Sequence, residues 1–380
     1  MAFRNIPHRL TSMARFGVSL KSNSNRDGPG RLQYKSNSSF NGKPYVNAHL
    51  PPPTAVLKQY PLFDDSRQWS SVSSDDAGFS GSGVWFNDGA GLVLKAVPAA
   101  GVVESDLQRI HHWIESARKA GIETLPAILP TARGQTAIPH DNRFWVLTTK
   151  RPGRADFCND NNDRRLRGIV DELARLHRFW SGRFGSFGPI PGVIRRLAKL
   201  DEGQAFLEQP SRLFIESHVA NRLPGWEEVR QLNELLPIRI LKARQKLQPL
   251  RHLQVPIHPC LCDCWHDHFL FEGDQLSGVI DFDAVKIDHA AVDLARAIGS
   301  LLSRDKERWW EAYNRYREVN PAANFPFEWI EILHETGQIV AGLYWLRKLV
   351  FDADRDGDIS RILPRVKLIV ESLSPDRLIL

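Results

Sequence analysis

The chain has 380 residues, of which 42% are hydrophobic and 9% aromatic, and its formal net charge is +6. It can bury one large or two moderate cores, and it lacks an apolar run of membrane-spanning length, an N-terminal secretory signal and a basic stripe interleaved with aromatic residues. We therefore expect a cytoplasmic globular protein without a membrane or nucleic-acid partner, whose excess of base attracts a phosphate-bearing ligand.

The first fifty residues are rich in Ser, Asn, Gly and Lys and contain few periodic apolar residues. We interpret residues 1–50 as a disordered N-terminal tail. The basic, acid-free start MAFRNIPHRLTSMARF leaves an amphipathic mitochondrial presequence as the alternative.

Residues 51–150 predict a small β-rich lobe with one helix. The runs GFSGSGVWF and LVLKAV flank an Asn-Asp-Gly turn and indicate a glycine-rich hairpin. The stretches TAIP and FWVLTT indicate further strands before the chain breaks at Pro152-Gly153. Between them, a helix is expected over 103–120, because four apolar residues recur on one face: Leu107, Ile110, Ile114 and Ala117.

Residues 151–380 predict a larger, mainly helical lobe. Helical patterns include RLRGIVDELARLHRFW, a long stretch over 202–248, and IEILHETGQIVAGLYWLRKLV. The exception is FLFEGDQLSGVIDF, which indicates a second hairpin around Glu-Gly-Asp. The expected fold class is therefore α+β, with two lobes.

The glycine-rich hairpin is the first candidate for ligand binding. Gly78, Gly81 and Gly83 would let backbone N–H groups approach phosphates closely, and Lys95 on the next strand would supply a cation. The alternative is an ordinary glycine-rich turn before an exposed lysine.

The segment 258–283 carries the most specific pattern. Asp263 is followed by His268, a hairpin and then Ile-Asp281-Phe. This order resembles the catalytic and metal-binding segment of the aminoglycoside phosphotransferase and choline kinase-like superfamily, which has a bilobal protein kinase-like fold. The stretches ELARLHRFW and DHAAVDLAR resemble two further family segments. The resemblance covers roughly residues 55–350.

The resemblance implies an ATP-dependent phosphotransferase with a small-molecule acceptor carrying a hydroxyl or amine. Asp263 takes the catalytic position, where it orients the acceptor and receives its proton. Asp281 takes the position that binds Mg²⁺, and His268 that of the second metal ligand. The acceptor itself is expected beside Asp263 and the helices of 181–250 and 300–350.

The resemblance also assigns nucleotide contacts. Residues 78–83, including Ser80, take the place of the loop that covers the phosphates, and Lys95 pairs with the α and β phosphates. The segment 144–153 takes the place of the hinge that binds adenine, with Leu147 and Thr149 as contacts. Glu104 or Asp106 is the candidate carboxylate for Lys95.

Two residues depart from the family pattern. His268 stands where the family usually has Asn, and Leu261 stands where it often has His. Mg²⁺ prefers oxygen ligands, so an imidazole suits it poorly. Asp283 or water then substitutes, another metal is used, or activity is weakened. A catalytically degenerate relative that binds nucleotide or a protein partner is the alternative function.

The cluster Cys260-x-Cys262-x-Cys264 with His266 and His268 contains zinc-ligand types, and a metal-sensing protein is a further alternative. Its spacing does not fit a zinc knuckle. Alternate residues of an extended segment face one side, so we expect the three cysteines to be buried packing residues.

The stretch DADRDGDI (352–359) matches the start of an EF-hand calcium loop. Its twelfth position is Leu363 in place of a bidentate Glu. We interpret the stretch as a solvated turn between two helices.

Overall fold

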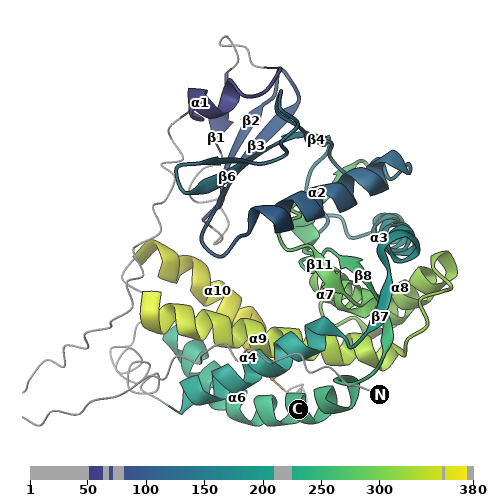
Figure 1. Cartoon of the computed structure of the whole chain (residues 1–380). Helices are drawn as coiled ribbons and strands as arrows, with labels where there is room; N and C mark the ends of the chain where they lie inside the picture. The colour runs from purple at the N-terminus through teal and green to yellow at the C-terminus, as the bar shows by residue number, and fades with distance from the viewer. Residues whose placement is uncertain (1–50, 63–67, 72–80, 209–224, 353–355, 375–380) are drawn as a thin grey trace, which may run out of the picture. The chain divides into compact units, whose positions relative to one another are not determined.

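The structure is a computed structural model, and it describes residues 51–62, 68–71, 81–208, 225–352 and 356–374 (Figure 1). All of these belong to one compact unit, Tyr45–Leu380. The expected tail over 1–50 lies outside the described residues. Within the described ranges, no helix is long and apolar enough to cross a membrane.

A six-stranded antiparallel sheet forms the β-rich part of the molecule. It follows a short helix, α1 (Thr54–Leu57), and confirms the expected first hairpin as β2 and β3. The strands are, in spatial order, β1 (Ser70–Ser71), β2 (Gly83–Asn87), β3 (Leu92–Pro98), β6 (Arg143–Thr149) and β4 (Ile128–Leu129), with β5 (Ile138–His140) also pairing with β6.

The alternation of side chains along β3 determines where Lys95 points. Leu92, Leu94 and Ala96 are buried in a small core that also contains Trp85. Because successive side chains of a strand face opposite sides, Lys95 lies on the other face of the sheet from this core.

Helix α2 (Glu104–Lys119) confirms the expected helix. The four apolar residues that predicted it are all buried, and Gly121 follows the helix with a φ of 94°. A glycine tolerates this left-handed conformation at a helix end.

The remaining described chain is mainly helical, as expected, so the structure has the expected α+β class (Figure 1). The pattern over 202–248 corresponds to parts of two helices, with 209–224 outside the described residues. The helices are α3 (Asp163–Phe184), α4 (Pro191–Leu207), α6 (Trp226–Leu247), α7 (Ala290–Leu302), α8 (Lys306–Val319), α9 (Phe327–Asp352) and α10 (Asp356–Leu373).

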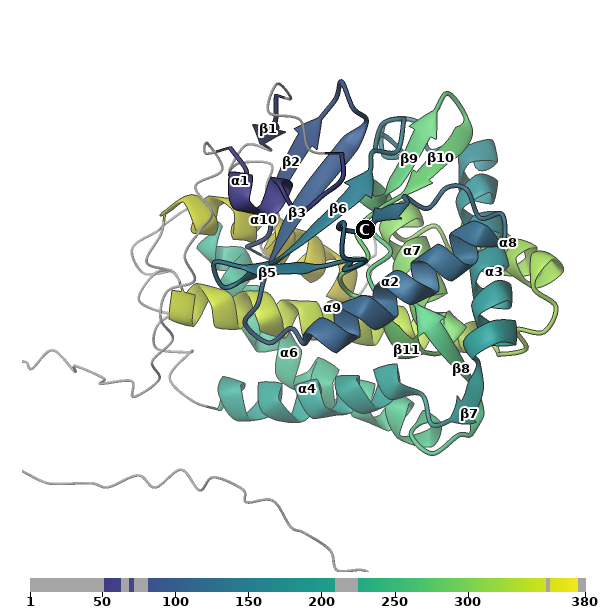
Figure 2. The ribbon, with the colours of Figure 1, turned by 45° about the horizontal axis from the view of Figure 1, so that its top comes forward.

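Two small antiparallel sheets accompany these helices. The hairpin β9 (Phe269–Glu272) and β10 (Gln275–Val279) confirms the second expected hairpin. The other sheet was missed by the sequence pattern and contains β7 (Ser186–Gly188), β8 (Val255–Cys260) and β11 (Lys286–Asp288). In Figures 1 and 2, β8 lies next to α3 and α7, with which it is in contact.

The EF-hand-like stretch coincides with the junction of α9 and α10. Helix α9 ends at Asp352 and α10 begins at Asp356, and the residues between them lie outside the described ranges. The expected calcium-free turn stays a prediction.

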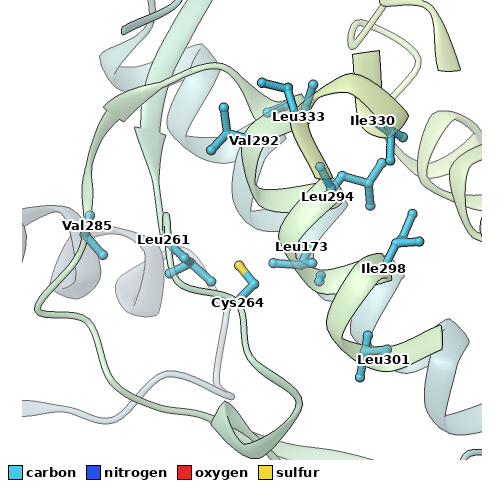
Figure 3. Packing of buried hydrophobic residues seen from close by; sticks show 14 of the residues in the cluster. Leu173, Leu261, Cys264, Val285, Val292, Leu294, Ile298, Leu301, Ile330 and Leu333 are labelled. Carbon is cyan, nitrogen blue, oxygen red and sulfur yellow. The ribbon is translucent and has the colours of Figure 1, made fainter. Parts of the chain in front are cut away.

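The cysteines after β8 contribute to the main core. Cys260 and Cys264 are 0% and 1% exposed, and Figure 3 shows Cys264 close to Leu173 and Leu261. The expected packing role is therefore confirmed for these two. Cys262 is only half-buried, so the expectation does not hold for it, and its positive φ of 62° interrupts the extended segment.

We expect Cys264→Ala to lower the free energy of unfolding by about 1 to 3 kcal/mol, because a buried sulfur atom is lost and a cavity remains. The control Cys158→Ala changes an exposed thiol and should shift the value by less than about 0.5 kcal/mol. Urea denaturation measures both. Stoichiometric zinc in the wild type that Cys264→Ala loses would contradict a packing role.

Candidate active site

A lysine and two carboxylates meet between the large sheet and the segment after β10. The Nζ atom of Lys95 lies 2.7 Å from Oδ1 of Asp281 and 2.8 Å from Oδ2 of Asp283. Burial by itself would lower the pKa of Lys95, but the charges of Asp283 and Asp281 outweigh it and hold the pKa above its ordinary value. The lysine is therefore a cation throughout the physiological range.

Asp281 is held in an unusual backbone conformation. Its φ is 65°, in the left-handed region that non-glycine residues seldom occupy. Burial would raise the pKa of its carboxyl, but the charge and hydrogen bond of Lys95 lower it below the ordinary value. Such conformations concentrate at functional sites, and the ionised carboxylate of this residue contacts Lys95.

His268 lies beside Asp281 because the N–H of Ile280 donates to the carbonyl of His268 at 3.0 Å. Its Nδ1 lies 2.8 Å from the backbone carbonyl of Asp263. A carbonyl only accepts, so Nδ1 carries the proton. In the neutral ring, Nε2 then has a free lone pair, and it lies 3.7 Å from Oδ2 of Asp281.

Asp263 lies on the loop that follows β8, and its side chain is 39% exposed. Its Oδ1 accepts a hydrogen bond of 3.2 Å from Nη2 of Arg296 on α7. The same guanidinium lies over the ring of Trp265, 4.1 Å from its centroid. Arg296 thus holds both the carboxylate and the aromatic residue two positions later, a role that the sequence did not reveal.

The loop that follows β8 is anchored by Asp293 of α7, which is fully buried. The backbone N–H groups of Leu261 and Cys262 each donate to its carboxylate at 2.6 Å. Nε2–H of His177 on α3 donates to it at 3.0 Å. On the other side of that ring, Nδ1 lies within hydrogen-bonding distance of the hydroxyl oxygen of Tyr316, at 2.8 Å. His177 belongs to the stretch ELARLHRFW and Asp293 to DHAAVDLAR. The sequence pattern of these stretches resembles the family but predicted no role for either residue.

The other residues that were predicted to contact the nucleotide lie partly inside and partly outside the described ranges. Gly78 and Ser80 lie outside the described residues. Gly81 has a φ of 73°, and its carbonyl accepts from Nη1 of Arg143 at 2.8 Å. On β6, the Leu147 side chain is buried in the small core, whereas Thr149 exchanges hydrogen bonds with the backbone of Ala127.

The proposed carboxylate partners of Lys95 require a correction. Glu104 accepts from Gln108 at 3.0 Å, and Asp106 accepts from Arg109 at 2.6 Å. Both pairs lie on the first two turns of α2, because residues three or four apart on a helix are neighbours. The carboxylates that contact Lys95 are instead those of Asp281 and Asp283.

The Cys/His cluster does not assemble as a metal site. Across the described ranges, only one group of three or more histidine, cysteine or acidic side chains has its potential ligand atoms close together. It consists of His177, Cys260 and Asp293. His177 and Asp293 already bind each other and the loop backbone. Cys262, Cys264 and His266 take no part in this group, so the geometry does not favour a metal sensor.

Solved structures with the same fold were found by structural comparison. An amicoumacin kinase in complex with AMP-PNP and Ca²⁺ superposes with a TM-score of 0.56 at 16% identity, over 86% of this chain and 96% of that one. An AMP-bound spectinomycin phosphotransferase gives 0.54 at 10% identity, over 85% and 97%. An aminoglycoside phosphotransferase from Alicyclobacillus acidocaldarius gives 0.53 at 13% identity, over 85% and 93%.

At these identities the likeness shows the fold, which is protein kinase-like. No curated protein sequence matches the chain. The model of the phosphotransferase enzyme family matches residues 71–327, more than half of the chain, and this range contains Lys95, Asp263 and Asp281. The chain therefore belongs to the phosphotransferase enzyme family.

Proposed function

We propose that this protein transfers the γ-phosphate of ATP to a hydroxyl or amine of a small-molecule acceptor. The observation that carries the proposal is the contact of Lys95 with Asp281 and Asp283. Asp281 lies 186 residues from Lys95 in the sequence. The contact brings the strand that follows the glycine-rich loop against the segment after β10, and the hydrogen bond from Ile280 to His268 joins that segment to the loop that carries Asp263. All four free cysteines also fit a reducing compartment such as the cytoplasm.

The nucleotide would bind between the large sheet and this loop. Gly81 and Gly83, with Gly78 and Ser80, would cover the phosphates, and Lys95 would pair with them. Backbone groups of 144–153 would contact adenine. The amicoumacin kinase structure contains AMP-PNP, and a spectinomycin phosphotransferase structure contains ADP; both support nucleotide binding by this fold.

A divalent cation, Mg²⁺ in the family pattern, would be held by Asp281 and His268. The two residues suit a divalent cation that accepts one nitrogen ligand, because Asp281 is ionised and directs Oδ2 toward the lone pair of His268 Nε2. When bound, the cation offsets the charge of the phosphate oxygens.

Asp263 would act on the acceptor. Its Oδ1 is held by Arg296, while its Oδ2 has no hydrogen-bond partner among the described residues. The acceptor oxygen would attack the γ-phosphorus as the bond to the β,γ-bridging oxygen breaks and ADP leaves. The acceptor proton would pass to Asp263. Arg296 acts as a positioning residue, since it fixes the direction of this carboxylate.

A second candidate is a degenerate member that binds nucleotide without transfer. The imidazole of His268 in a position suited to an oxygen ligand favours this alternative. It keeps every nucleotide contact above and differs only in the chemical step, so binding and transfer have to be measured separately.

The first experiment tests nucleotide binding. ATP with its divalent cation should raise the melting temperature of the wild type, because it binds the native state alone. Lys95→Met removes the cation but keeps the hydrocarbon stem, and it should weaken binding by roughly 10-fold to 100-fold. The control Lys199→Ala removes an exposed lysine paired with Glu202 and should bind as the wild type does. A folded protein with no shift at millimolar nucleotide would contradict the proposal.

The second experiment separates the two aspartates, with ADP release on a metabolite library identifying the acceptor. Asp263→Asn should leave nucleotide affinity nearly unchanged, while transfer falls by roughly 10² to 10⁴. Asp281→Ala should weaken nucleotide binding and abolish transfer together. Wild-type transfer by Asp263→Asn would overturn its assignment. Nucleotide binding without ADP release on any acceptor would favour the degenerate member.

A further inference from the structure

Two atoms of the site face each other without a hydrogen bond to join them. Nε2 of His268 and Oδ2 of Asp281 are 3.7 Å apart, which is too far for a hydrogen bond. In the neutral ring both atoms carry lone pairs, because the proton of His268 is on Nδ1. Metal–ligand bonds measure about 2.0 to 2.2 Å for nitrogen and oxygen donors, so one ion can contact both atoms.

His268 is oriented as a metal ligand by its own second hydrogen bond. The bond from Nδ1 to the carbonyl of Asp263 fixes both the tautomer and the direction of the ring. Metal-binding histidines almost always donate their other N–H to a carbonyl or carboxylate in this way. The side chain is only 14% exposed, which limits its alternative positions.

Asp281 can serve the ion and the lysine together. Its Oδ1 binds Lys95 at 2.7 Å, and its Oδ2 is directed toward His268. Asp267 lies 3.8 Å from His268 Nε2, but it does not converge with Asp281 as a third ligand in the described part of the chain. The protein therefore supplies one nitrogen and one oxygen, and nucleotide phosphates and water must supply the rest.

We propose that this site takes a divalent transition-metal ion, for which Mn²⁺ is the probe, in preference to Mg²⁺, with Nε2 of His268 bonded directly to the ion. The inference rests on the proposed function, because the nucleotide completes the coordination. Mg²⁺ is a hard cation that takes oxygen ligands, whereas the affinity of first-row transition-metal ions for a site with a nitrogen ligand rises from Mn²⁺ to Cu²⁺, so Mn²⁺ is the most stringent probe of this series. His268 thus changes the metal preference of the site without removing the site.

The test uses the full-length protein with the non-hydrolysable nucleotide AMP-PNP. Calorimetric titration gives the affinity of Mn·AMP-PNP and of Mg·AMP-PNP, and pulsed electron paramagnetic resonance detects nitrogen bound to Mn²⁺. Comparing protein labelled with ¹⁵N-histidine with unlabelled protein shows whether that nitrogen belongs to a histidine. The variants are His268→Asn and the matched control His266→Asn. His266 lies in the same turn, but it contacts Ser300 at 3.0 Å.

The wild type and His266→Asn should show a histidine nitrogen on Mn²⁺ and bind Mn·AMP-PNP more tightly than Mg·AMP-PNP. His268→Asn should lose the nitrogen signal, and its preference for Mn²⁺ should fall by at least about tenfold. Tight binding of Mn·AMP-PNP without a histidine signal, or an equal preference in His268→Asn, would overturn this inference and leave the proposed function standing. No binding of either nucleotide complex would overturn both.

Discussion

The geometry of the candidate site depends on one buried carboxylate. Asp293 is removed from solvent, and three donors satisfy it: the N–H groups of Leu261 and Cys262 and the ring of His177. A buried charge is tolerated only when it is paired and hydrogen-bonded, and breaking such a pair costs roughly 3 to 5 kcal/mol. Through these bonds and Tyr316, helices α3, α7 and α8 determine the path of the loop (Figures 1 and 2).

The positions of the functional groups follow from that path. Once Leu261 and Cys262 are fixed, Asp263 is within reach of Arg296, and its carbonyl can hold the ring of His268. His268 in turn receives the backbone of Ile280 and so places Asp281 near its own ring. The acceptor side and the metal side are thus joined by a single backbone carbonyl.

Much of the fold and part of the candidate site could be predicted from the sequence, because the informative patterns are local. The hairpins, α2 and the order of Asp263, His268 and Asp281 depend on spacing within short segments. Contacts between distant segments could not be derived in this way, which is why Asp281 and Asp283 were not recognised as the partners of Lys95. Strand β8 was missed because Pro256 and Pro259 argue against a strand, although β7 and β11 accept it in the observed register. The burial of Asp293 likewise depends on how α7 packs.

The central claim is that Asp293 holds the loop that carries Asp263, and hydrogen exchange of the Leu261 and Cys262 amides tests it most directly. In the wild type these two amides should exchange as slowly as amides in the core of α3. In Asp293→Asn, an N–H₂ group replaces one acceptor oxygen, so at least one of them should exchange faster by about tenfold or more, while amides of β3 keep their protection. Unchanged protection of both amides in a folded Asp293→Asn protein would contradict the account.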